Sequence, residues 1–125
     1  MQRMMLKSKI RGGRITATEL HYEGSVGIDA HWLASADILP GEQVHVLNLN
    51  NGSRLTTYAL SMPAGSGAIA LRGAAARMGC VGDEVILLTY AQVDNAEATA
   101  FESRVIHVDR PVPRRERRNR NEAGK

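Results

Sequence analysis

Residues 44–60 read VHVLNLNNGSRLTTYAL, two apolar stretches joined by the polar run Asn50-Asn51-Gly52-Ser53. Asn-Gly pairs readily adopt the positive φ angles that a tight hairpin turn requires. The stretch therefore predicts a β-hairpin with strands at residues 44–49 and 55–60. Comparable short apolar segments, broken by turn residues about every 8 to 15 positions, continue along the chain and indicate an all-β protein with little helix.

The remaining elements follow from the same alternation of apolar segments and turn residues. Chain reversals are expected at Gly12-Gly13, at Gly24 and, as a hairpin turn, at Gly65-Ser66-Gly67. Short strands at this density favour a small closed barrel, because closure removes exposed sheet edges. The further predicted strands are residues 4–10, 15–17, 26–29, 68–71, 84–90 and 104–108, with helical turns at 31–36 and 73–78.

The composition is that of one ordinary globular domain. The chain has 125 residues, of which 43% are apolar and 23% charged. Its single cysteine excludes an internal disulfide framework, and no apolar run is long enough to span a bilayer. Aromatic residues make up only 4%, which argues against a stacking platform for single-stranded nucleic acid. Arg3, Lys7 and Lys9 interrupt the first apolar positions, so we expect a cytoplasmic protein without a membrane partner.

The net charge of +3 is unevenly distributed. From Arg104 onward there are eight Lys/Arg and three acidic residues, whereas residues 1–103 hold eight Lys/Arg and ten acidic residues. We therefore divide the chain into one barrel domain, residues 1–110, and a basic, disordered tail, residues 111–125. Such a tail can bind RNA or anionic lipid nonspecifically, but a solubilising extension is the simpler interpretation, and nucleic acid is not an expected partner.

Other candidate sites are weak. Cys80 has no cysteine beside it, which favours a buried or half-buried thiol over a nucleophile. Gly65-Ser66-Gly67 lacks the following Lys of a phosphate loop. No metal site is expected, because ten or more residues separate each of the four histidines, His21, His31, His45 and His107, from the next.

The segment His21-Tyr22-Glu23-Gly24-Ser25 has the most distinctive chemistry. Gly-Ser is a common turn dipeptide, but a Ser hydroxyl held beside the preceding carbonyl can attack it and shift the peptide to an ester. β-Elimination of that ester, followed by hydrolysis, would leave Ser25 as a pyruvoyl group at a new N-terminus. An ordinary side chain would then have become an electrophilic ketone.

Further motifs lie in order around this segment. They are Met5-Leu6-Lys7-Ser8-Lys9-Ile10, Ile28-Asp29, Asn51-Gly52 with Arg54, Thr57-Tyr58, Gly65-Ser66-Gly67, Gly73-Ala74-Ala75-Ala76-Arg77, Gly82-Asp83 and Tyr90-Ala91. Together with residues 21–25, they resemble the pyruvoyl-dependent aspartate 1-decarboxylase family over nearly all of residues 1–108. No single motif is specific, but their order and spacing in so short a chain are.

The resemblance implies a six-stranded double-psi β-barrel with short helical turns, assembled as a homotetramer with active sites between neighbouring subunits. It also implies self-cleavage between Gly24 and Ser25 into a β chain, residues 1–24, and an α chain, residues 25–110. L-Aspartate would form a Schiff base with the covalently bound pyruvoyl group derived from Ser25 and lose CO2. The product, β-alanine, would feed pantothenate and coenzyme A synthesis. Whether cleavage needs a maturation protein stays open.

The resemblance also assigns roles to polar side chains. Lys9 and Arg54 would hold the two substrate carboxylates, and Tyr58 would protonate the carbanion after decarboxylation. The chemistry agrees, because a dicarboxylate needs two separate cations and Arg offers a planar fork where Lys offers a mobile point charge. Without the resemblance, Lys9 reads as a solvated strand residue, Arg54 as a charge at a hairpin end and Tyr58 as a half-buried strand aromatic.

Other residues are placed around the pyruvoyl group by the same resemblance. Thr57 would assist self-cleavage and contact substrate, and Tyr22 would line the site. The backbone that contacts substrate would be that of Gly73, Ala74 and Ala75.

Two positions depart from the family pattern. Arg11-Gly12 stands where family members commonly have His-Arg, and Arg72, which we also expect to line the site, replaces an Asn. A cation there could slow self-processing, alter the acidity of Tyr58 or offer an extra anchor for an anionic substrate. Three outcomes stay open: an ordinary aspartate decarboxylase, a paralogue acting on another acidic amino acid or a phosphonate analogue, and an unprocessed relative. The last would be a noncatalytic binding module that uses an oligomeric surface or its basic tail to bind protein or nucleic acid.

Overall fold

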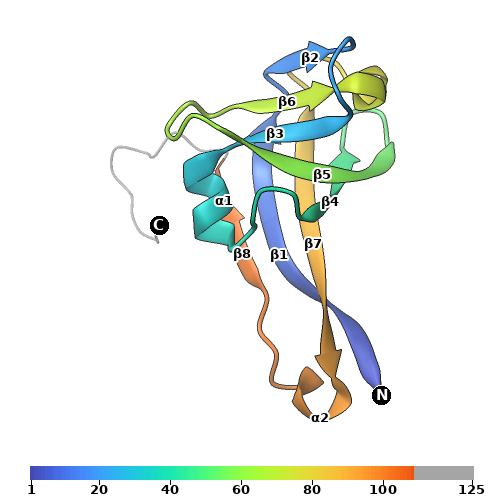
Figure 1. Cartoon of the computed structure of the whole chain (residues 1–125), viewed down its shortest axis with the longest axis vertical. Helices are drawn as coiled ribbons and strands as arrows, with labels where there is room; N and C mark the ends of the chain where they lie inside the picture. The colour runs from blue at the N-terminus through green and yellow to red at the C-terminus, as the bar shows by residue number, and fades with distance from the viewer. Residues whose placement is uncertain (109–125) are drawn as a thin grey trace.

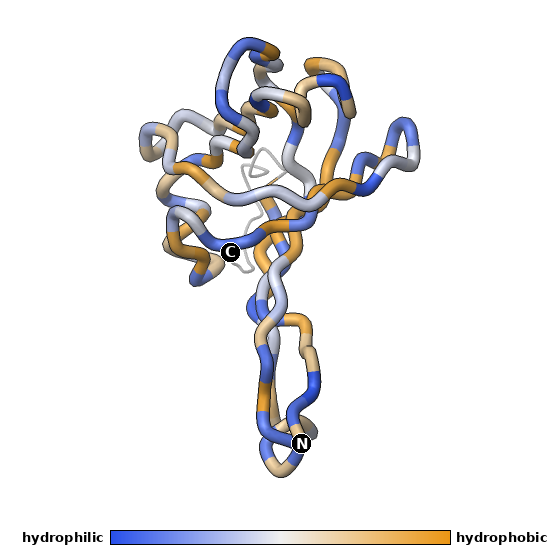
Figure 2. The backbone as a smooth tube through the Cα atoms, turned by 45° about the vertical axis from the view of Figure 1, so that its right-hand side comes forward, coloured by the Kyte–Doolittle hydropathy of each residue, from blue (hydrophilic) through white to orange (hydrophobic). Residues whose placement is uncertain are grey.

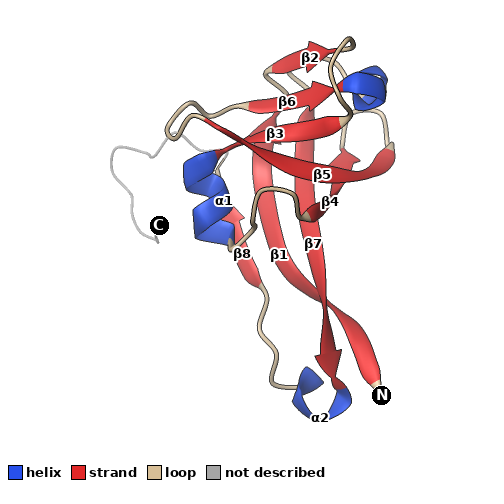
Figure 3. Cartoon of the chain, in the orientation of Figure 1, coloured by secondary structure: helices blue, strands red, loops and turns tan. Residues whose placement is uncertain are grey.

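The chain folds mainly as β-strands, which confirms the predicted all-β class (Figure 3). The computed structural model describes residues 1–108, so the predicted tail at residues 111–125 lies outside the described part. None of the described helices is long and apolar enough to cross a membrane. In chain order the elements are β1 (Gln2–Arg14), β2 (Ala17–Glu19), β3 (Ser25–Asp29), α1 (Ala30–Ala36), β4 (Gln43–Asn48), β5 (Arg54–Met62), β6 (Ile69–Arg72), the 3-10 helix η1 (Gly73–Met78), β7 (Glu84–Asp94), α2 (Asn95–Ala98) and β8 (Arg104–His107).

The strands of residues 1–108 follow one hydrogen-bonded order, β2-β6-β3-β5-β4-β7-β1-β8. Strand β5 joins the strands β2, β6 and β3 to the strands β4, β7, β1 and β8, because it pairs with β3 on one side and with β4 on the other. In Figure 1 the strands β3, β5 and β6 run across the long strands β1 and β7. The short strands β2 and β8 form the two ends of the order. The six strands between them are consistent with a small double-psi barrel, but β2 and β8 do not pair with each other, so the sheet is not closed as predicted.

The predicted hairpin is present as β4 and β5. Its antiparallel register pairs His45 with Thr56 and Leu47 with Arg54. Gly52 in the turn has a φ of 76°, a conformation that glycine adopts without the steric cost other residues have. The Asn-Gly signal therefore located both strands and their pairing.

The predicted turn at Gly12-Gly13 is wrong. Strand β1 continues through both glycines to Arg14, with its register against β7 shifted between Ile10 and Gly13. Gly12 has a φ of 85°, so the pair forms a bulge in a long strand rather than a reversal. The strand predicted to begin at Ile15 begins at Ala17 instead, and Ile15 itself is buried in the core.

The core is aliphatic, and its side chains come from strands on both sides of β5 in the sheet order. Ile10, Ile28, Val46, Leu71 and Leu87 are each 1% exposed or less, and they come from five different strands. Burying a side chain of this size stabilises a fold by about 1.5 to 3 kcal/mol. This core holds β3, which begins at Ser25, within the body of the protein.

The segment Gly65-Ser66-Gly67 is not a hairpin turn, which corrects the prediction. Strands β5 and β6 lie on either side of β3 instead of pairing with each other, so the segment crosses the end of β3. The N–H groups of Gly65 and Gly67 donate to the Asp29 carboxylate at 3.1 and 2.8 Å, and the His31 N–H donates to it at 2.8 Å. The anion that this loop binds is therefore the carboxylate of Asp29, a side chain of the same protein.

The outer ends of β1 and β7 leave the body as a twisted two-stranded ribbon closed by α2 (Figure 2). The Asn95 N–H donates to the Met1 carbonyl at 2.9 Å, and Met4 is 62% exposed. A two-stranded ribbon gains little stability by itself in water. Its continuity with the long strands of the body is what fixes it.

We predict that Asp29→Asn destabilises the fold by about 2 to 3 kcal/mol at neutral pH, because backbone N–H groups lose a charged acceptor. Burial by itself raises the pKa of Asp29, but the N–H groups of Gly67, His31, Gly65 and Trp32 outweigh it and bring the pKa below its ordinary value of 3.8. The charged carboxylate therefore contributes its full stability above pH 3.8 and loses it as the pH falls further.

Urea unfolding of wild type and variant across this pH range tests the prediction. The difference between them should shrink below pH 3.8, the ordinary pKa of the group. Asp94→Asn, on the exposed ribbon, is the control. A difference that stays constant with pH would contradict the account.

Candidate active site

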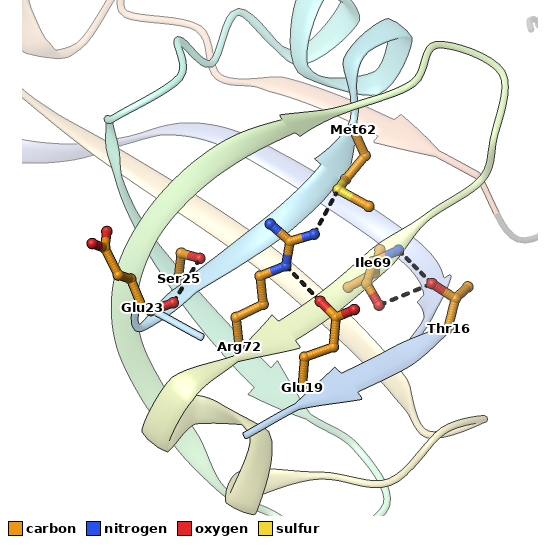
Figure 4. A network of polar contacts seen from close by, with 7 residues as sticks. All are labelled: Thr16, Glu19, Glu23, Ser25, Met62, Ile69 and Arg72. Carbon is orange, nitrogen blue, oxygen red and sulfur yellow. Dashed lines mark hydrogen bonds and ion pairs between the residues drawn. The ribbon is translucent and has the colours of Figure 1, made fainter. Parts of the chain in front are cut away.

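The loop at residues 20–24 connects β2 to β3 around the end of β6. Arg72 on β6 is the register partner of Glu19, where the loop begins, and of Ser25, where it ends. Figure 4 shows Glu19, Glu23, Ser25 and Arg72 together at this edge of the sheet. The sheet thus fixes both ends of the loop that contains the Gly24–Ser25 peptide.

Ser25 lies at the first position of β3 and is fully buried. Its hydroxyl donates to the Glu23 carbonyl at 3.2 Å. The side chain therefore points back along the chain, over the peptide that joins Gly24 to Ser25. The Ser25 oxygen is thus held back toward the residues that precede it and away from bulk water, as a nucleophile for the Gly24 carbonyl would need to be.

Gly73 packs directly against the loop. A Cβ at this position would lie 2.7 Å from the Cα and N of Gly24 and 2.7 Å from the Tyr22 carbonyl oxygen. Gly73 also has a φ of 64°, a region that glycine occupies at little cost. Ala74 next to it is exposed, whereas Ala75 belongs to the hydrophobic core. The first turn of η1 therefore supports the peptide at residue 24.

The far end of η1 is tied to the hairpin turn. Asn48 is nearly buried, and its side-chain amide donates to the Asp83 carboxylate at 2.9 Å and to the Met78 carbonyl at 3.3 Å. The Asn51 side chain also donates to the Met78 carbonyl, at 3.0 Å. The Asn48 amide, and after it the Cys80 N–H, lowers the pKa of Asp83 against a smaller opposing effect of burial. Cys80 itself is exposed, so its predicted burial is wrong.

Arg54 lies in a pocket of about 340 Å³ on another part of the surface. Its guanidinium donates to the Tyr90 hydroxyl at 3.2 Å, and a ring nitrogen of His45 lies 3.5 Å away. The rings of His45 and Tyr90 meet edge to face with centroids 5.1 Å apart. Met4, Glu42 and Gln43 complete the pocket. Sequence reasoning did not assign His45 or Tyr90 to this site, although His45 lies in the first strand of the predicted hairpin.

Strand β5 connects this pocket to the Gly24–Ser25 region. Tyr58 pairs with Gln43, which lines the pocket. The next residue on β5, Ala59, pairs with Val26, the residue after Ser25. Thr57 is the register partner of the buried Val44 and so shares its side of the sheet, opposite to Tyr58.

Lys9 and Arg54 lie on β1 and β5, which are three steps apart in the sheet order. Lys9 pairs with Leu88 on β7, Leu88 pairs with His45 on β4, and His45 pairs with Thr56 on β5. Neighbouring strands are about 4.8 Å apart, so Lys9 and Thr56 are separated by about 14 Å along the sheet. Arg11, which lies on β1 at one of the two positions that depart from the family pattern, is exposed and pairs with His107 of β8.

Arg72 is engaged by its own chain. Its Nε donates to Glu19 at 2.7 Å and an Nη donates to the Met62 sulfur at 3.5 Å, both visible in Figure 4. The guanidinium carbon lies 4.4 Å from the centroid of the Tyr22 ring. The Arg72 side chain is only 15% exposed, and Tyr22 remains 57% exposed. These contacts leave the guanidinium little freedom to serve as an additional anchor for substrate.

The fold is a small, mostly β domain in which a buried serine begins a strand directly after the loop at residues 20–24. The chain belongs to the aspartate decarboxylase family, whose model matches residues 1–112. It is 54% identical over 109 residues to an aspartate 1-decarboxylase of Syntrophobacter fumaroxidans, covering 87% of this chain and 88% of that protein. Aspartate 1-decarboxylases of Acaryochloris marina and Thermoanaerobacter pseudethanolicus are 53% and 50% identical to this chain. Each aligned region spans 87% of this chain, and it spans 83% and 93% of the two relatives, respectively.

We predict that Gly73→Ala slows cleavage at residue 24 at least about tenfold, because the added methyl must displace the Gly24 backbone and small misplacements of reacting atoms are costly. Intact mass over time measures the cleavage. Gly41→Ala is a matched control, since Gly41 also has a positive φ, 89°, but open space around its Cβ position. Equal cleavage rates in two folded variants would refute the supporting role of Gly73.

Proposed function

We propose that this protein is an aspartate 1-decarboxylase, which converts L-aspartate to β-alanine and CO2 with a pyruvoyl group made by its own cleavage at Gly24–Ser25. The observation that carries the proposal is the buried Ser25 hydroxyl, held by the Glu23 carbonyl over the peptide to be cut. Membership of the aspartate decarboxylase family supports the reaction. As a source of β-alanine, the enzyme would supply pantothenate and coenzyme A synthesis.

The cleavage follows from the groups at this position. The Ser25 oxygen attacks the Gly24 carbonyl carbon, the C–N bond breaks, and an ester joins the two residues while the Ser25 nitrogen becomes a free amine. Elimination then breaks the bond between the Ser25 Cβ and its oxygen and releases Gly24 as a carboxylate. Addition of water and loss of ammonia leave a ketone at residue 25. Overall, one water is consumed and one ammonia is released.

The residues around Ser25 fit a pyruvoyl group. The buried first position of β3 excludes bulk water, and the bare Cα of Gly73 leaves room beside residue 24. The group supplies a ketone that takes up the substrate amine and withdraws electrons as CO2 leaves. The rest of the chemistry is binding and proton transfer by the chain itself.

Strand β5 supplies those functions in the proposal. Arg54 binds one substrate carboxylate from the pocket it shares with His45 and Tyr90, two rings that hold its guanidinium in place. Tyr58, between this pocket and β3, delivers a proton from its hydroxyl to the carbon that has lost CO2. Thr57, on the other side of β5, assists the cleavage. The backbone of Gly73, Ala74 and Ala75 lines the substrate position.

A second copy of the chain completes the site in this proposal. Lys9, assigned to the other carboxylate, lies on β1 and is not among the residues that line the Arg54 pocket. None of the residues lining the Arg54 pocket comes from the loop at residues 20–24 or from β3. Contributions from neighbouring subunits bring such groups together, which supports a homotetramer with active sites between its subunits.

The engagement of Arg72 favours the ordinary aspartate decarboxylase over the other outcomes. An extra anchor for a different anionic substrate needs a free guanidinium, and this one contacts Glu19, Met62 and Tyr22. A noncatalytic binding module would use an oligomeric surface or the tail, and the tail lies outside the described residues. We place the enzyme in the cytoplasm, where a single exposed free thiol, that of Cys80, is compatible with reducing conditions. Cleavage without a maturation protein is the simplest form of the proposal.

We predict that Ser25→Ala abolishes both cleavage and decarboxylation, because it removes the attacking oxygen and the source of the ketone. Intact mass under denaturing conditions should show a wild-type fragment of residues 1–24 and a second fragment that is lighter by one ammonia than its sequence. Formation of β-alanine from L-aspartate measures the activity. Ser61→Ala, at an exposed position of β5, is the control. A Ser25→Ala protein that still decarboxylates aspartate would refute the pyruvoyl mechanism.

We also predict that Arg54→Gln leaves cleavage intact but lowers kcat/KM for aspartate about 30- to 150-fold, the equivalent of about 2 to 3 kcal/mol for a lost charge-assisted contact. Steady-state kinetics on fully cleaved protein provide the measurement. Arg14→Gln, which removes an exposed arginine paired with Glu84, should have no effect. Unchanged kinetics in Arg54→Gln would remove Arg54 from the substrate site.

A further inference from the structure

The loop at residues 20–24 is closed at its base by one residue. Arg72 is the backbone register partner of both Glu19 and Ser25, so the end of β6 lies between the start and the finish of the loop. The strand before the loop, β2, has only three residues and pairs with β6. The position of the scissile peptide therefore depends on β6 from both sides.

The side chain of Arg72 holds the same loop a second time. Its contact with Glu19 is a charge-assisted hydrogen bond of 2.7 Å on a side chain that is 15% exposed, where screening by water is weaker than at an open surface. Its planar face lies over the Tyr22 ring, 4.4 Å from the centroid, a cation–π contact with the loop. Met62 contacts the remaining side of the guanidinium at 3.5 Å. One cation thus joins the start of the loop, its middle and β5.

After cleavage the loop depends more on Arg72 for its attachment to the body of the protein. Before cleavage the loop is tethered at both ends, whereas afterwards residues 20–24 extend from the short strand β2 as a free chain end. The reaction also places a new carboxylate on Gly24, the neighbour of the residue that pairs with Arg72. An arginine is suited to holding a free chain end and to lying near a new carboxylate. The N–H groups of its guanidinium can bind a carboxylate while the plane of the guanidinium stays stacked on an aromatic ring.

We propose that Arg72 is a positioning residue for self-cleavage, which clamps residues 19–22 so that Gly24–Ser25 is held against Gly73, and which then retains the new carboxyl end on the body. The inference rests on the proposed function, because cleavage at Gly24–Ser25 is part of it. It gives the arginine at this position a task within its own chain in place of contact with substrate.

The test compares Arg72→Gln and Glu19→Gln, each of which breaks the ion pair, with Arg72→Lys and with the exchange Arg72→Glu/Glu19→Arg. Arg14→Gln, which breaks the exposed pair with Glu84, is the matched control. The first readout is the rate of cleavage by intact mass, and the second is trimming of the short fragment by a carboxypeptidase after cleavage. Urea unfolding establishes that each variant is folded, and Glu19, with a side chain 40% exposed, is the substitution least able to disturb the core.

We expect cleavage to slow at least tenfold in Arg72→Gln and Glu19→Gln, less in Arg72→Lys, and to recover partly in the exchanged pair. The short fragment should resist trimming in wild type and be shortened in the slowed variants. Wild-type rates and equal protection in folded Glu19→Gln and Arg72→Gln would overturn the clamp while leaving the proposed function intact. A wild-type chain that stays whole would overturn the proposed function and the clamp together.

Discussion

The carboxylate of Asp29 determines how the parts of the site meet. Three backbone N–H groups, from His31, Gly65 and Gly67, converge on it. They fix the path by which the chain leaves β5, crosses the end of β3 and enters β6. Because β6 is thereby placed beside β3, Arg72 and Gly73 at its end lie against the loop at residue 24. The geometry at the Gly24–Ser25 peptide is thus set from the opposite end of β3.

Local signals in the sequence predicted elements better than they predicted partners. The hairpin at residues 44–60 was found because Asn-Gly between two apolar stretches marks a turn, but its register came only from the structure. Gly65-Ser66-Gly67 was also a correct break, yet it was assigned to a hairpin, since nothing local indicates that β3 lies between the strands it connects. Gly12-Gly13 failed for the opposite reason. Two glycines permit a bulge as readily as a turn, and the long pairing of β1 with β7 selects the bulge.

The candidate site shows the same division. Gly24, Ser25 and Tyr58 were named through ordered motifs, and the structure places Tyr58 on the strand beside β3. The close approach of Gly73 to Gly24 could not be read from the sequence, because it depends on a positive φ and a contact between distant segments. The pairing of Arg72 with Glu19 is likewise a product of the β2–β6 register. The placement of Lys9 and Arg54 on strands three steps apart follows from strand order, which residue spacing does not encode.

The length of β1 has a consequence for the cleaved form that we propose. The fragment of residues 1–24 contains all of β1, a strand of 13 residues that pairs with β7 and with β8. A cut at residue 24 would therefore leave the short fragment built into the sheet, with β1 between β7 and β8 and β2 beside β6 at the other end of the order. Once unfolded, however, the two fragments separate in solution, and folding again becomes a second-order encounter in place of a unimolecular collapse. The proposed self-processing would thus make the lifetime of the enzyme depend on its unfolding rate instead of its equilibrium stability.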